Sequence, residues 1–91
     1  STVRAALNLA RAQLDAARRA VPESEVRLDE ARLNLARRER LFKEELATAA
    51  DMDQARAEVN SIAARIESLR EQIVVAERQV ALQETAIDDM V

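Results

Sequence analysis

A seven-residue apolar repeat runs through both halves of this 91-residue chain. In each half a large apolar side chain recurs at every seventh position, and a second residue follows most of these after three positions. This second residue is Ala or Ser in the first half and Ala, Ile, Leu or Met in the second. Heptads of this kind place their apolar side chains on one helical face, so the pattern predicts two coiled-coil helices of about 40 residues each. The large members are Leu7, Leu14, Val21, Leu28, Leu35 and Phe42 in the first half and Met52, Val59, Ile66, Ile73, Val80 and Ile87 in the second.

The two repeats match each other if the chain folds back near residue 47. Each large seam residue then faces a partner in the other half, as Leu14 faces Val80. The charges beside the seam also become complementary, although each exposed pair contributes only about 0.2–1 kcal/mol. We therefore predict an all-α fold, a two-helix antiparallel coiled-coil hairpin in which the charges select the register. The expected charge pairs are Arg11 with Glu84, Arg18 with Glu77, Glu25 with Arg70 and Glu39 with Arg56.

Pro22 lies inside the first predicted helix. A proline in a helix interior removes a hydrogen bond and costs about 3 kcal/mol, so it could split the first half and produce a three-helix bundle. The heptad nevertheless keeps its phase across Pro22, which falls at an outward position. This favours a first helix that is kinked or broken near Pro22 over a reversal of the chain.

The reversal near residue 47 carries a helix start signal. Thr48 and Asp51 have a spacing close to that of a capping box, in which the Thr48 hydroxyl accepts from free backbone amides of the new helix and the Asp51 carboxylate favours its positive end. We expect one module over residues 1–91, with a first helix over about 2–44, a tip over about 45–48 and a second helix over about 49–89. Since the chain has no glycine, we expect the tip to close with a residue such as Glu45 or Lys43 in a less favoured backbone region.

Composition argues against several functions. The net charge of −3 does not suit the concentrated basic surface that nucleic acids require. With no His, Cys or Gly, the chain lacks the usual general base, the thiol nucleophile, the best zinc ligands and a phosphate-binding loop. No 18-residue apolar run is present. We therefore expect no enzyme activity, cofactor, metal, nucleic-acid partner or direct membrane insertion for this segment.

Around the expected tip, Arg37 is followed by Leu41 after four residues and by Thr48 after seven more, and Asp53 and Ala55 follow near the start of the second helix. In this respect the sequence resembles the α-helical hairpin of the HlyD-like membrane fusion proteins, the periplasmic adaptors of tripartite bacterial export pumps. Thr48 stands where that family has a serine, and it keeps the hydroxyl. Many relatives also have a glycine just before that serine, which this chain lacks. The resemblance covers essentially the whole chain, as one module excised from a larger adaptor.

The resemblance implies a structural and docking function. In this family the hairpin tip meets a TolC-like outer-membrane channel, so Arg37, Leu41 and Thr48 are implied as tip contacts. Neighbouring hairpins would pack side by side as a homo-oligomer, and domains outside this segment would bind an inner-membrane transporter. The implied setting is the periplasm, with the full-length protein anchored to the inner membrane and serving efflux or secretion.

Simpler interpretations remain for each group. Arg37 can be a solvated helix arginine, Leu41 can pack beside Phe42, and Thr48 can be a plain N-cap. The apolar residues that point outward near the open end can be covered by a neighbouring hairpin or by another domain; they are Leu9, Val74, Val75 and Leu82. A generic coiled-coil scaffold or oligomerisation segment is therefore the alternative function. A membrane-surface amphipathic helix is disfavoured, because the seam is narrow and the charges are mixed.

Overall fold

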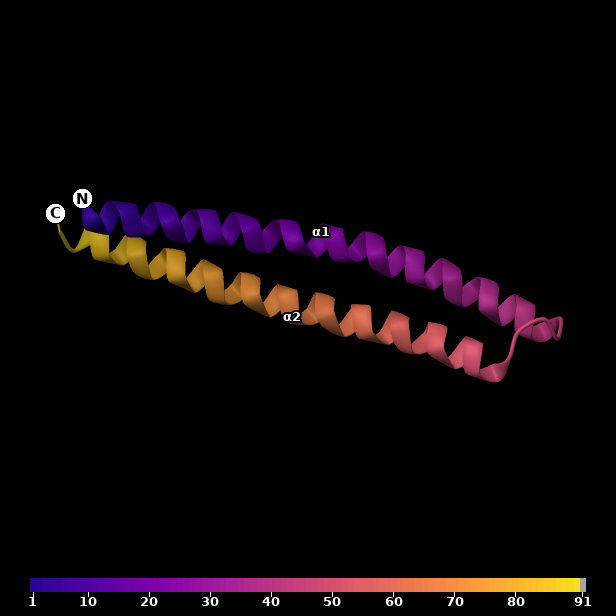
Figure 1. Ribbon diagram of the computed structural model, residues 1–91. Helices are drawn as coiled ribbons and strands as arrows, with labels where there is room; N and C mark the ends of the chain where they lie inside the picture. The colour runs from indigo at the N-terminus through magenta and orange to yellow at the C-terminus, as the bar shows by residue number, and fades with distance from the viewer. Residues whose placement is uncertain (91) are drawn as a thin grey trace. The chain divides into compact units, whose positions relative to one another are not determined.

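The computed structural model describes residues 1–90 and contains two long helices joined by a short turn (Figure 1). Helix α1 spans Thr2–Lys43, and helix α2 spans Ala49–Asp88. The sequence predicts about 2–44 and about 49–89 for these helices. The fold is an all-α helical hairpin, as predicted.

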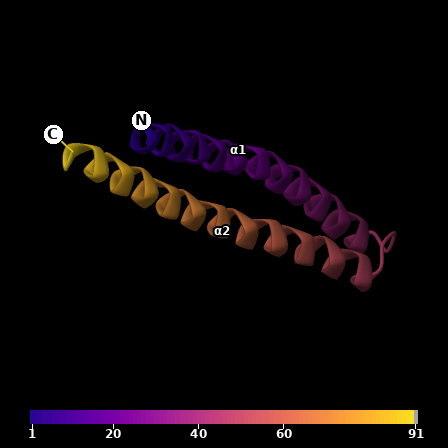
Figure 2. The same cartoon turned by 60° about the vertical axis from the view of Figure 1, so that its left-hand side comes forward.

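The chain divides into two compact units, and each contains a part of both helices. Unit 1 combines Ser1–Val21 with the chain from Ser68 onward, and unit 2 is Pro22–Glu67. Within each unit the segment of α1 and the segment of α2 lie side by side and run in opposite directions (Figures 1 and 2). Each unit is therefore an antiparallel helix pair.

The core of unit 1 forms where the two apolar faces meet. Leu7, Ala10 and Leu14 of α1 form one buried cluster with Val80 of α2. Three partly buried residues of α2 pack against this cluster: Ile73, Ala76 and Ile87. Leu14 and Val80 thus belong to the same core, which confirms the predicted pairing of the two repeats in this unit.

Two ion pairs flank the core of unit 1 on one side. Arg11 Nη2 lies 3.7 Å from Glu84 Oε1, and Arg18 Nη2 lies 3.5 Å from Glu77 Oε2. Both are pairs that the register predicts. All four side chains are about half exposed, so solvent screens these pairs and each adds little stability. Their main effect is to disfavour a slipped register, in which like charges would meet.

Unit 2 also buries residues of both helices. Leu28 and Ala31 of α1 and Ala55 and Ile66 of α2 are buried, together with Ser24. A third predicted ion pair is present here, since Arg56 Nη2 lies 3.9 Å from Glu39 Oε1. The fourth expected pair, Glu25 with Arg70, is divided between the two units and stays a prediction.

Helix α1 continues through Pro22, which lies inside it. The chain therefore does not reverse at this point, and the three-helix alternative is not adopted. Pro22 is exposed, so its ring does not interrupt the apolar seam. Because proline has no backbone N–H, the carbonyl of Arg18 lacks its usual helical partner. The kink near Pro22 stays a prediction.

Candidate functional site

The turn between α1 and α2 closes with a Schellman motif. The N–H of Leu46 donates to the carbonyl of Leu41 at 2.8 Å, and the N–H of Glu45 donates to the carbonyl of Phe42 at 3.0 Å. These are the two hydrogen bonds that define the motif, with Glu45 as the first residue beyond the helix cap. The carbonyl groups of Leu41 and Phe42, close to the end of α1, are thus satisfied within the turn.

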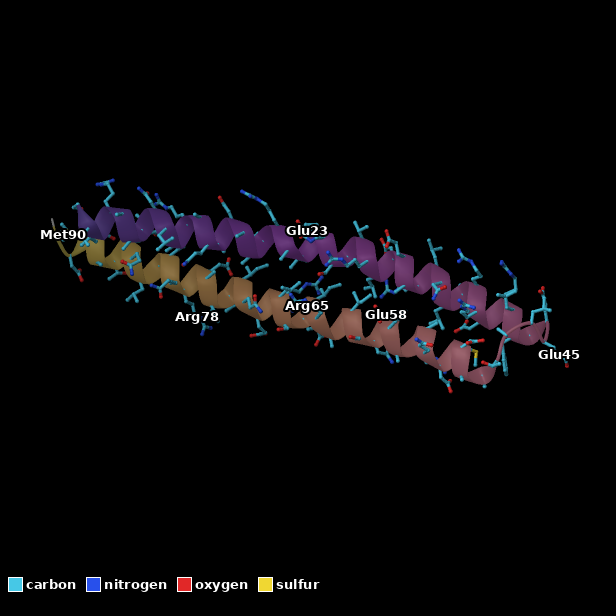
Figure 3. All side chains as sticks on the ribbon, viewed as in Figure 1. Glu23, Glu45, Glu58, Arg65, Arg78 and Met90 are labelled. Carbon is cyan, nitrogen blue, oxygen red and sulfur yellow. The ribbon has the colours of Figure 1, made fainter. Side chains whose placement is uncertain are left out.

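Glu45 has the left-handed backbone conformation that this motif requires. Its φ is 62°, and it is the only residue with a positive φ in the part of the chain that the structure describes. Glycine usually occupies such a position because a Cβ atom is disfavoured there. The sequence places this conformation at Glu45 or Lys43, and the structure confirms Glu45. Figure 3 shows the Glu45 side chain at the turn, pointing away from both helices.

Helix α2 begins with a reciprocal capping box. The N–H of Asp51 donates to Thr48 Oγ1 at 3.0 Å, and the N–H of Thr48 donates to Asp51 Oδ2 at 3.1 Å. Both residues therefore satisfy a backbone amide that the helix start would leave free. The predicted capping box is confirmed, and Thr48 is the N-cap of α2.

The carboxylate of Asp51 is stabilised in its charged form. The hydrogen bond from the backbone N–H of Thr48 contributes most to lowering the pKa of Asp51 below its ordinary value. A hydrogen bond with the Thr48 side chain and the positive charge of Arg38 lower this pKa further. The capping box is thus coupled to the protonation of one carboxyl group.

We expect a Thr48→Ala substitution to lower the free energy of unfolding by about 1 kcal/mol, because α2 loses its N-cap acceptor. Thr48→Ser, which keeps the hydroxyl, is the matched control and is expected to stay close to wild type.

The depressed pKa of Asp51 adds stability above the ordinary aspartate pKa of about 3.9. That stability is lost as the pH falls through the folded-state pKa.

Urea unfolding of the wild type and of Asp51→Asn across acidic pH measures this coupling. The difference in stability between the two proteins is expected to shrink as the pH is lowered below about 4. A difference that stays constant over this range would show that Asp51 is not charged in the capping box.

The three predicted site residues lie on both sides of the turn. Arg37 is exposed and Leu41 is half-buried, and because they are four residues apart they share one face of α1. Thr48 is exposed on the other side of the turn, and its hydrogen bonds go to Asp51 of its own helix. Leu41 also contributes its carbonyl group to the turn. Two of the three residues thus take part in closing the tip.

The two other residues of the family spacing lie inside α2. Asp53 pairs with Arg56 at 3.7 Å, one turn along the helix. Ala55 is buried. Both residues are therefore occupied within the hairpin, and neither presents a free group at the tip.

Two apolar side chains at the turn are missing from the predicted site. Leu46 is 70% exposed, and Phe42 is 40% exposed. Leu46 falls outside the heptad phase and immediately follows the residue that reverses the chain, which is the sequence signal that could have identified it. The turn thus presents apolar surface at Phe42 and Leu46.

A shallow polar groove of about 310 Å³ lies between the two helix segments of unit 2. Its lining carries charges of both signs, since Arg38 comes from α1 and Asp51 and Glu58 come from α2. Figure 3 shows Glu58 on the side of α2 that faces α1.

Among residues 1–90, no group of three or more His, Cys, Asp and Glu side chains is placed to hold a metal ion. Nor does any helix in that range have both the length and the apolar character needed to cross a bilayer.

Comparisons with protein-family models, with curated proteins and with solved structures found no match for this chain. Any binding role of the tip therefore has to be inferred from its own side chains.

Proposed function

We propose that this chain is the docking hairpin of a periplasmic adaptor protein, which joins an inner-membrane transporter to a TolC-like outer-membrane channel for efflux or secretion. One observation supports this proposal above all. The residues that resemble the tip motif of such adaptors lie at the turn of a two-helix hairpin. Arg37 and Leu41 occupy the last two turns of α1, and Thr48 is the N-cap of α2.

The chemistry of the tip suits contact with the ends of partner helices. The Arg37 guanidinium is exposed, and it can donate several hydrogen bonds to the free carbonyl groups of a partner helix or to a carboxylate. The exposed side chains of Phe42 and Leu46 supply apolar area for the same contact. Thr48 keeps the turn in place through its hydrogen bonds to Asp51.

The test is to place negative charges at the tip, in place of a positive and an apolar side chain, without unfolding the helices. In the adaptor that contains this hairpin, Arg37→Asp and Leu41→Asp are expected to abolish both transport and cross-linking to the outer-membrane channel, while far-UV circular dichroism shows unchanged helicity. Arg19→Asp and Leu33→Asp are matched controls, because both are exposed positions of α1 outside the turn. The controls are expected to support transport.

Arg37→Asp decides the test if Leu41→Asp disturbs the turn, since Arg37 takes no part in the Schellman motif. Normal transport and normal cross-linking by Arg37→Asp would show that the tip is not the docking site.

A generic coiled-coil scaffold or oligomerisation segment is the second candidate. It is favoured by large apolar side chains exposed on the sides of the helices, among them Leu9, Val75 and Leu82. A scaffold associates along its sides and is indifferent to changes at the turn. The tip variants above therefore separate the two functions.

A further inference from the structure

The outward face of α1 in unit 2 carries its charges in two blocks of opposite sign. This face consists of the three heptad positions that lie furthest from the seam. Between residues 22 and 33 these positions hold carboxylates and no basic side chain, and we call them the acidic block: Glu23, Asp29 and Glu30. Between residues 36 and 43 they hold basic side chains and no carboxylate, and we call them the basic block: Arg37, Arg40 and Lys43.

The charges of both blocks are exposed and unpaired in the hairpin. All six side chains are exposed, and within residues 1–90 none of them takes part in an ion pair. The end of a helix explains a part of the basic block, because Arg40 and Lys43 lie in the last turn of α1, where the helix dipole favours positive charge. The acidic block lies in the middle of α1 and has no such explanation.

Two large apolar side chains lie on the same outward face. Val26 and Leu33 are 58% and 68% exposed. They are seven residues apart, so they lie two turns from each other along one side of the helix. Single exposed apolar residues are normal on protein surfaces. A pair at the heptad spacing, however, can pack against a second helix that has the same spacing.

A helix that covers this face has to match both charge blocks. It needs basic side chains opposite the acidic block, acidic side chains opposite the basic block, and apolar side chains opposite Val26 and Leu33. A helix with its acidic residues in the first half and its basic residues in the second is favoured by its own dipole. Such a helix matches the two blocks when it runs antiparallel to α1.

A second copy of this chain fits the face less well. Two copies of α1 that meet antiparallel at Leu33 place the acidic block of each against the basic block of the other. Positions 26 and 40 are both seven residues from Leu33, so Val26 of each copy would then lie against Arg40 of the other. Covering a guanidinium group with an apolar side chain removes hydration without supplying a partner, which is unfavourable. A different helix can be apolar opposite both Val26 and Leu33.

We propose that the outward face of α1 in unit 2 binds an amphipathic helix of another protein, antiparallel to α1, through the two charge blocks and the apolar pair Val26 and Leu33. The apolar pair supplies the area removed from water, and the charge blocks select the direction and register of the bound helix. This proposal goes beyond docking at the turn and does not depend on what the turn binds.

The first test uses a synthetic, fluorescently labelled peptide of about 20 residues, long enough to span the two blocks. The peptide has leucines at the heptad spacing, glutamates in its first half and lysines in its second half. Fluorescence anisotropy with the 91-residue chain is expected to show saturable binding. A control peptide of the same composition, with glutamate and lysine alternating along its length, is expected to bind at least about tenfold more weakly.

The second test locates the contact with variants of the chain. Leu33→Lys is expected to weaken binding of the first peptide by about tenfold or more, because it places a charge in the apolar contact. Leu9→Lys is the matched control and is expected to leave binding unchanged, since Leu9 is also an exposed leucine of α1 but lies in unit 1. Both variants should keep wild-type helicity by far-UV circular dichroism.

A charge exchange then tests the register. Glu30→Lys is expected to weaken binding, and a peptide in which glutamate replaces the lysines that face position 30 is expected to restore it. Arg37 is left unchanged in all variants, so the result does not depend on the residues of the tip motif.

Three results would overturn the proposal. They are no saturable binding at peptide concentrations up to about 1 mM, equal binding of the two peptides, and equal weakening by Leu9→Lys and Leu33→Lys. Sedimentation equilibrium provides a further check. A dimer of the chain that Leu33→Lys converts to a monomer would assign this face to a second copy instead of another protein.

Discussion

Replacing Leu14 by alanine is expected to lower the free energy of unfolding by about 2–5 kcal/mol. Leu14 is 9% exposed and belongs to the same buried cluster as Leu7 and Val80. Only two helix segments form this core, so no further layer of side chains can move in to fill the space that the substitution leaves. Small folds have a small free energy of unfolding. A loss of this size should therefore lower the urea concentration at the unfolding midpoint strongly.

Leu33→Ala provides the matched control for this measurement. The same chemical change is made on the same helix, but Leu33 is 68% exposed. The expected change in the free energy of unfolding is within about 0.5 kcal/mol. Urea unfolding followed by far-UV circular dichroism measures both variants. Equal losses at the two positions would contradict the seam described for unit 1.

Replacing Pro22 by alanine is expected to raise the free energy of unfolding by about 2–3 kcal/mol. Alanine restores the N–H that can donate to the carbonyl of Arg18, and it removes the clash of the proline ring with the preceding turn. Part of the gain is offset, because proline also restricts the unfolded chain. Pro22 is exposed within α1, so the substitution leaves the buried side chains in place.

Arg19→Ala is the control for Pro22→Ala, because it changes an exposed residue of α1 close by. It should alter the free energy of unfolding by no more than about 0.5 kcal/mol. If Pro22→Ala gives no greater stability than this control, α1 is already interrupted at Pro22 in solution, since a residue outside a helix has no helical cost to relieve.

The fold could be predicted from the sequence because two independent patterns agree. The apolar repeat identifies the seam, and the alternation of charges selects which residues of the two helices face each other. Leu14 with Val80 and Arg11 with Glu84 follow from these patterns and are present in the structure. The capping box could be predicted for a simpler reason, since Thr48 and Asp51 are three residues apart and interact locally.

The geometry of the turn is harder to predict from the sequence. Without a glycine, local propensity does not distinguish Glu45 from Lys43 as the residue with a positive φ. Which residue takes the positive φ depends on which carbonyl groups remain free at the end of α1. With Glu45 in this conformation, the N–H of Leu46 donates to the carbonyl of Leu41. The exposure of Leu46 follows from that choice. Arg37, Leu41 and Thr48 are predicted from their resemblance to the tip motif of the adaptors, and their binding role stays a prediction because affinity depends on a partner surface that the sequence does not contain.

The hydrogen bonds of the turn limit how another molecule could recognise the hairpin. The N–H groups of Glu44, Glu45, Leu46 and Thr48 all donate to acceptors inside the turn or the adjoining helix ends. A molecule that docks here finds few free main-chain N–H groups in the turn, so specificity for hydrogen-bond acceptors has to come from side chains. Specificity should therefore be transplantable: grafting Arg37, Phe42 and Leu46 onto an unrelated hairpin with the same turn geometry should transfer it.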